Sequence, residues 1–178
     1  MKIKRCPIIF HNVISTSTRC KTNEWYITAR EFRNAIIKNG LYSTGPIIYK
    51  VSHFDEPLNE ADYTFYIPIN TPLEMEDNDK YCFYELWKFD DGLAFRHADL
   101  DDDLEVSYEL LQAAAKANKL ELEESFYHIY LDVYGEGIID IYAPIVKAKI
   151  GSETGGYFGE EVGFGGFIKF EKPKEEGK

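Results

Sequence analysis

Cysteine is scarce in this 178-residue chain, and the three that occur lie far apart. Cys6, Cys20 and Cys82 are odd in number and include no Cys-x-x-Cys pair, which argues against a disulfide framework or a zinc site. We interpret them as small buried or half-buried thiols. The histidines also lack the spacing of a metal-binding helix, so we expect neither a metal nor another cofactor.

Long apolar runs are missing as well. No stretch approaches the roughly 20 residues that cross a bilayer. The apolar residues 7–10, which follow a basic N-terminus, are too few for a signal-peptide core of about 7–15 residues. We therefore expect a cytoplasmic protein without a membrane partner.

Positive charge is in deficit: 20 basic residues face 31 acidic ones, for a net charge of −11. A nucleic-acid surface needs clustered Lys and Arg to displace counterions from phosphates, whereas here the basic residues are scattered. We therefore expect no nucleic-acid partner. An acidic surface suits a cationic ligand or a basic protein partner.

Aromatic residues are abundant, with 13 Tyr and 12 Phe, and two aromatic segments end alike. Residues 63–69 read YTFYIPI and residues 138–145 read IIDIYAPI, which places Pro68 and Pro144 at an offset of 144 − 68 = 76 residues. The preceding elements also recur. Alternation and helical spacing predict strands at 13–19, 47–51 and 63–69 with a helix at 28–39, and then strands at 93–97, 126–134 and 138–145 with a helix at 103–119.

Local signals set the expected boundaries of these elements. Thr28 and Glu31 form a capping-box pattern, and Gly40 is a stop signal for the first helix. An added strand at 81–89 precedes the second unit, and the dipeptide Asp91-Gly92 predicts a hairpin after it.

These patterns predict an α+β fold with duplicated β-α-β-β units related by pseudo-twofold symmetry. One such unit leaves an apolar sheet face exposed, so two would form one antiparallel sheet with both helices on one side and a central groove. We expect a single domain over residues 1–150, with repeats at about 8–70 and 80–146. The glycine-rich extension at 151–178 is expected to be partly an edge strand, at 164–171, or flexible.

Side-chain alternation predicts the two faces of the strand at 126–134. Tyr127 and Ile129 would face the helices, whereas His128 and Tyr130 would face solvent or the groove.

Two segments resemble a known family. GLAFRHADL at 92–100 and ESFYHIYLDVYGEGIIDIYAPI at 124–145 are similar to motifs of gyrase-inhibitory-protein-like domains, also known as bacterial transcription-activator effector-binding domains. The resemblance covers about residues 8–146. It implies a ligand groove between two repeats; members sense drugs and other amphipathic compounds, bind partner proteins, or in some branches hydrolyse small molecules. A similarity to uncharacterised Firmicute proteins found beside LXG-type toxins implies an accessory or immunity-like role.

The chain departs from the family pattern at the position where the groove acid usually lies. His128 stands there, and a neutral His supplies no fixed negative charge for a buried cation. The glycine that usually follows the strand histidine is also absent, because Ala98 follows His97.

We predict a ligand-binding surface of recurring aromatic rings with one polar contact. Its residues are Tyr49, Tyr66, Trp87, His128, Tyr130 and Tyr142. No Ser or Cys occurs in a recognisable nucleophile motif, so we predict no catalytic residue.

The leading hypothesis is a non-enzymatic domain that binds an amphipathic or aromatic small molecule. One alternative is a protein-interaction module for a toxin-like partner. The other is a small-molecule hydrolase, since Asp132 and Asp140 fall on facing strands of one expected hairpin. The sequence leaves the oligomeric state open.

Overall fold

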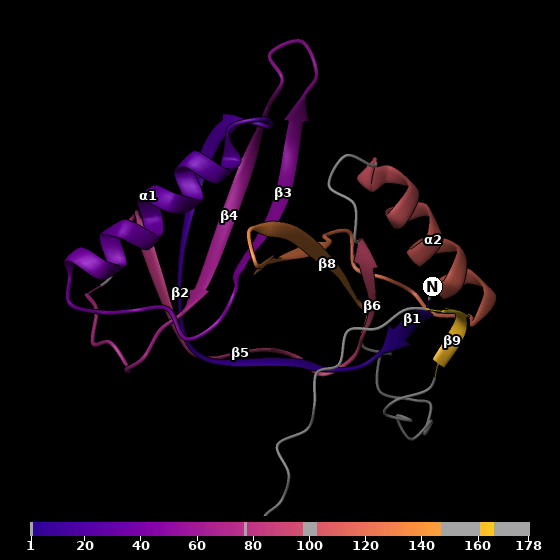
Figure 1. The fold of residues 1–178 in the computed structure, drawn as a ribbon. Helices are drawn as coiled ribbons and strands as arrows, with labels where there is room; N and C mark the ends of the chain where they lie inside the picture. Colours follow the sequence, from indigo (N-terminus) through magenta and orange to yellow (C-terminus); the bar gives the residue numbers. More distant parts are fainter. Residues whose placement is uncertain (1, 77, 98–102, 147–160, 166–178) are drawn as a thin grey trace, which may run out of the picture.

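A computed structural model describes residues 2–76, 78–97, 103–146 and 161–165 (Figure 1). One sheet contains all the described strands, in the order β5-β2-β4-β3-β7-β8-β6-β1-β9. Neither described helix is long and apolar enough to span a membrane. In chain order the elements are β1 (Lys2–Arg5), β2 (Ile8–Lys21), α1 (Trp25–Lys38), β3 (Ile47–Asp55), β4 (Glu60–Pro68), β5 (Tyr81–Phe89), β6 (Gly92–His97), α2 (Leu104–Ala117), β7 (Tyr127–Val133), β8 (Glu136–Pro144) and β9 (Glu161–Gly165).

The predicted α+β fold is confirmed, because the order β-α-β-β occurs twice. The first half contains β2, α1, β3 and β4; the second contains β6, α2, β7 and β8. The halves join where β3 pairs antiparallel with β7, from Ile47↔Tyr130 to Lys50↔Tyr127. Tyr49 packs in the α1 core and its cross-strand partner His128 bonds to α2, so both helices cover the same face of the sheet.

The outer strands do not follow the predicted repeat. The strand predicted at 81–89 forms as β5, but it pairs with β2 and extends the first half. The second half is extended instead by β1, which pairs with β6 and which the sequence reading missed. The predicted hairpin at Asp91-Gly92 is therefore wrong: the chain turns there, but β5 and β6 are not neighbours. Asp91 instead forms an ion pair with Arg5, with 2.9 Å between Arg5 Nε and Asp91 Oδ1.

The two helices begin in different ways: α2 has a side-chain cap at its N-terminus and α1 has none. Helix α2 begins as predicted after an acidic cap, because the Asp103 carboxylate accepts a hydrogen bond from the Glu105 N–H at 3.0 Å. Helix α1 begins at Trp25, before the predicted Thr28, and Glu24 at its N-cap makes no side-chain cap bond. Gly40 ends α1 as predicted, with φ at +77°, in the left-handed region that glycine enters without strain.

Both faces of the sheet are buried at the start of β7, and this overturns the predicted faces of that strand. His128 lies on the helix side, whereas Tyr127 and Ile129 lie on the opposite face. That opposite face is covered rather than solvated, because aromatic side chains of β2 and β5 pack across it. We call this group the rear aromatic cluster; it consists of Phe10, Tyr66, Trp87, Phe89, Tyr127 and Tyr142.

The strand predicted in the glycine-rich extension is found in part. Residues 161–165 form β9, an edge strand that pairs with β1 through Ile3↔Val162. Residues 166–171, the greater part of the predicted strand, lie outside the described residues.

Candidate functional site

An aromatic group lies where the two halves meet, on the helix side of the sheet. We call it the central aromatic cluster, and it consists of Trp25, Tyr49, Tyr108, His128 and Tyr130. Because β3 pairs with β7, Tyr49 and His128 are cross-strand partners, and their rings stack with 4.6 Å between centroids. Trp25 comes from the start of α1 and Tyr108 from the start of α2. The cluster therefore takes side chains from α1, β3, α2 and β7.

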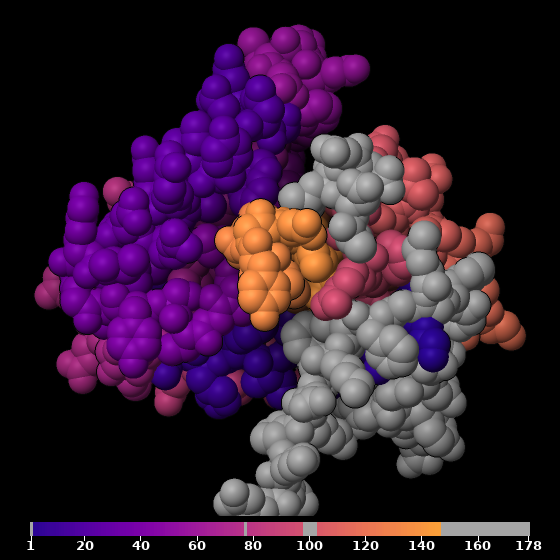
Figure 2. Space-filling model, viewed as in Figure 1, coloured from indigo at the N-terminus to yellow at the C-terminus, as the bar shows by residue number. Residues whose placement is uncertain are grey.

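Trp25 and Tyr130 form the accessible side of this cluster. The Trp25 ring lies 4.6 Å from that of Tyr49 and meets Tyr130 edge-on at 5.8 Å. Trp25 and Tyr130 are half-buried, whereas Tyr49 beneath them is only 3% exposed. The cluster therefore offers aromatic surface supported by a buried floor. Figure 2 shows the β7–β8 hairpin, in orange, standing between the α1 and α2 halves.

His128 is held as a neutral imidazole. Its Nδ1 lies 3.2 Å from the Tyr49 carbonyl oxygen, which can only accept, so Nδ1 carries the proton. Its Nε2 then accepts from the Tyr108 hydroxyl at 2.5 Å. Complete burial lowers the pKa of His128 to about 4. The centre of the cluster therefore has a polar, uncharged group that uses both ring nitrogens.

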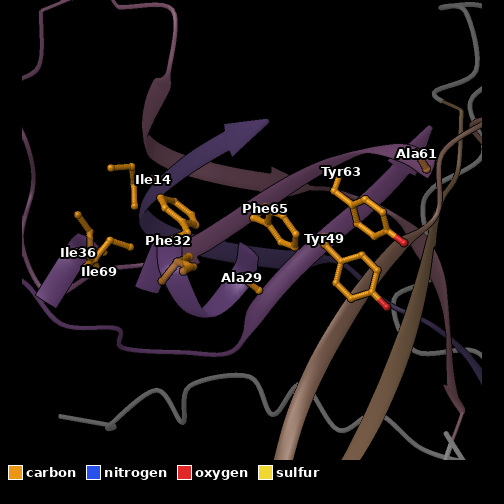
Figure 3. Packing of buried hydrophobic residues seen from close by; sticks show 10 residues of the cluster. Ile14, Ala29, Phe32, Ile36, Tyr49, Ala61, Tyr63, Phe65 and Ile69 are labelled. Atoms are coloured by element: carbon orange, nitrogen blue, oxygen red, sulfur yellow. The ribbon is translucent and has the colours of Figure 1, made fainter. Parts of the chain in front are cut away.

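Tyrosine hydroxyls supply the remaining polar groups. Burial raises the pKa of Tyr63 to about 12 and raises the pKa values of Tyr49 and Tyr108 as well. All three thus remain neutral hydroxyls, and that of Tyr108 already donates its proton to His128 Nε2. Figure 3 shows the hydroxyls of Tyr49 and Tyr63 pointing to the same side of the α1 core. The cluster itself contains no carboxylate, and the nearby acids Asp103 and Glu105 are exposed at the start of α2.

A second buried histidine attaches α2 beside this cluster. His97 Nδ1 lies 2.8 Å from the Ser107 hydroxyl, one residue before Tyr108. Its Nε2 is buried and has no hydrogen-bond partner among the described residues. The adjacent pair Ser107 and Tyr108 therefore connects α2 to two sheet histidines.

The six predicted site residues do not form one surface. Tyr49, His128 and Tyr130 meet in the central cluster. The other three, Tyr66, Trp87 and Tyr142, are buried in the rear aromatic cluster on the opposite face. The prediction that all six line one groove is wrong, because successive strand residues alternate between faces.

Sequence reasoning missed Trp25 and Tyr108. Trp25 falls outside the first helix as predicted, because that prediction starts three residues later, at Thr28. Tyr108 sits on α2 four residues after Leu104, a spacing that places the two side chains on the same helix face. That spacing could have shown that Tyr108 faces the sheet. Its contact with His128 depends on the register of the strands, which the sequence does not show.

Asp132 and Asp140 lie on the paired strands β7 and β8 as expected, but they do not form a carboxylate pair. Asp140 lies opposite Ile129 and Asp132 opposite Gly137, so the acids are not cross-strand neighbours. Asp132 is four residues from His128 and therefore shares its face of the sheet, whereas Asp140 is two residues from Tyr142 and shares the opposite face. Asp140 is also engaged by Arg96, with 2.8 Å between Oδ1 and Nε.

Comparison with family models gives one match, over residues 9–150, to the family described as "Domain of unknown function (DUF5085)". The chain belongs to the DUF5085 family. A search of curated proteins found no match.

Solved structures share the fold of this DUF5085 chain. EcmrR in a complex with DNA matches with a TM-score of 0.61 at 19% identity, over 82% of this chain and 58% of that one. The chain thus spans little more than half of EcmrR. The EcmrR C-terminal domain alone matches with a TM-score of 0.56 at 19% identity, over 81% of this chain and 98% of that domain.

Two further structures are similar at lower identity. SAV2435 bound to tetraphenylphosphonium has a TM-score of 0.50 at 11% identity, over 82% of this chain and 94% of that one. A hydrolase from Listeria innocua has a TM-score of 0.51 at 10% identity, over 80% of this chain and 91% of that one. At such identities the likeness shows a common fold.

Proposed function

We propose that this domain binds an amphipathic, aromatic small molecule against the central aromatic cluster, without enzymatic chemistry. The supporting observation is the half-buried pair Trp25 and Tyr130, which lies over the stacked rings of Tyr49 and His128. Ring faces supply apolar contact, and tyrosine hydroxyls supply hydrogen bonds at fixed positions. The ligand-bound structure of SAV2435 supports the same class of ligand for this fold.

The charge of the cluster bears on which aromatic compound it prefers. His128 is neutral and the five cluster residues include no carboxylate. A permanent cation would therefore gain only cation–π attraction, of about 0.5–2 kcal/mol. We expect a neutral aromatic molecule with a hydrogen-bond acceptor, such as triphenylphosphine oxide, to bind at least as tightly as tetraphenylphosphonium.

Tryptophan fluorescence provides a direct test, because the chain has only Trp25 and Trp87. In a Trp87→Phe background, Trp25 is the sole indole reporter. Titration with each of the two compounds should change its emission saturably. Adding Tyr130→Ala should weaken binding about five- to tenfold, corresponding to the roughly 1 kcal/mol of an aromatic contact.

Tyr134→Ala is the matched control. Tyr134 occupies the tip of the same hairpin and is fully exposed, away from the ring contacts of the cluster. This variant should bind as the parent does. Equal affinities for the Tyr130→Ala and Tyr134→Ala variants, or no saturable response to either compound, would contradict the proposed function.

A further inference from the structure

An apolar hollow lies beside α1, away from the central cluster. It has a volume of about 340 Å³ and is bounded by α1, β2, the start of β5 and the segment around Leu73 and Met75. The other apolar walls are Ile14, Phe32, Ala35, Ile36, Leu41 and Tyr81. Figure 3 shows Ile14, Phe32 and Ile36 at one end of the α1 core and Tyr49 and Tyr63 at the other. We call this hollow the apolar chamber.

A second hollow of about 280 Å³ adjoins it along the same helix. The two share Phe32, Ala35 and Tyr81 as walls. The remaining walls of the second hollow are polar: Thr16, Ser17, Thr18, Thr28, Glu31 and Lys80. We call it the polar chamber. Strand β2 explains why the lining changes from apolar to polar. Its helix-facing side carries Ile14 first and then Thr16 and Thr18.

We propose that these adjoining chambers form a binding site for an uncharged amphiphile, with its alkyl chain in the apolar chamber and a hydroxyl-bearing head in the polar one. The apolar chamber has no charged side chain among its walls, so it suits a hydrocarbon. Met75 in its wall has an unbranched side chain with three rotatable bonds, which can adapt to an alkyl chain.

The polar chamber determines the chemistry of the head group. Glu31 and Lys80 place one charge of each sign there, so the lining has no net charge to favour an anionic or a cationic head. The Thr16 hydroxyl donates its proton to the Lys80 carbonyl oxygen at 2.8 Å. Thr16 can then only accept from a ligand. A neutral polyol, which donates hydrogen bonds, matches both conditions.

Met75 offers a specific reporter, since the chain has only two methionines, Met1 and Met75. The full chain, labelled with ¹³C at the methionine methyls, would be titrated with 1-monooctanoylglycerol below its micelle concentration. The Met75 methyl resonance should shift saturably. Octanoate and octyltrimethylammonium, which have the same chain length but charged heads, should bind at least fivefold more weakly.

Two variants test the position of the ligand. Ala35→Phe fills the wall shared by both chambers and should weaken binding at least tenfold, whereas Ile37→Phe, on an exposed position of the same helix, should not. Thr16→Val removes the hydroxyl that accepts from the head group, so it should weaken the binding of monooctanoylglycerol several-fold. Octane-1-thiol has the same chain length without the glycerol head, and its binding should not change. This second variant retains a β-branched side chain of similar shape, so it tests the head group even if Ala35→Phe fails to fold.

The site is independent of the proposed function at the central cluster. Tyr130→Ala should therefore leave the Met75 response unchanged. The inference is overturned if no saturable shift occurs, if the charged amphiphiles bind as tightly as the glycerol ester, if Ala35→Phe and Ile37→Phe bind alike, or if Tyr130→Ala abolishes the shift.

Discussion

The His128 side chain hydrogen bonds to both halves of the molecule. Nδ1 contacts the Tyr49 carbonyl of the first half, and Nε2 contacts the Tyr108 hydroxyl of the second. Protonation would put a hydrogen on Nε2, which now accepts, and would place a charge in a fully buried position. The contact between the two halves therefore depends on His128 remaining neutral.

Stability should consequently fall in mild acid. The pKa of His128 is lowered to about 4 in the folded protein, against about 6.5 when unfolded. Between these values the unfolded chain binds more protons, so the contribution is complete above pH 6.5 and is lost as pH falls towards 4. We expect this residue alone to lower the free energy of unfolding by about 2 kcal/mol between pH 7.5 and pH 5. Urea denaturation at the two pH values measures it.

His128→Gln provides the reference for that experiment. Glutamine does not titrate, so the variant should show a smaller decrease over the same pH interval, while the contributions of the acidic residues stay common to both proteins. If wild type and variant lose the same free energy of unfolding, the buried neutral imidazole is not responsible.

The two helices reach similar lengths by different means. Helix α2 is defined locally, by an N-cap aspartate and a following acid that suits the helix dipole. Helix α1 has no acid in its first turn and no side-chain cap. It begins where the chain turns out of β2 through the Glu24 N–H to Lys21 carbonyl bond of 3.0 Å, and Trp25 then packs on Tyr49. Its start is thus fixed by tertiary contacts.

Alanine at each N-cap should separate these two cases. Asp103→Ala removes a cap bond and should destabilise the fold by about 1 kcal/mol. Glu24→Ala removes a side chain that makes no cap bond and should cost less than about 0.5 kcal/mol. Urea denaturation monitored by circular dichroism compares them. Equal losses would show that the Asp103 cap contributes nothing specific.

At the scale of the molecule, the N-terminal strand belongs to the half that follows later in the sequence. Strand β1 precedes the first half in sequence but pairs with β6 in the second, and Ile3 is fully buried in the α2 core. The Arg5–Asp91 ion pair holds the start of β6 to this strand. The first residues are therefore part of the distant half, and β5 in exchange completes the first half (Figure 1).

Matched isoleucine substitutions test this exchange. Ile3→Ala should reduce the free energy of unfolding by about 2–5 kcal/mol, because it leaves a cavity in the α2 core. Ile9 lies on β2 and is 53% exposed, so Ile9→Ala should cost less than about 1 kcal/mol. Similar small losses for both variants, in urea denaturation, would mean that β1 is not an integral part of the second half.

The sequence alone determined the α+β class and the order of the helices and of the strands from β2 to β8. These follow from local rules: side-chain periodicity, glycine and proline positions, and acids at a helix start. Tertiary structure decided which residues meet. Alternation shows that His128 and Tyr130 share a face, but not which face the helices cover, and here both faces are buried. That choice came from the register of Tyr49 with His128 and from β5 pairing with β2, contacts between residues far apart in the chain.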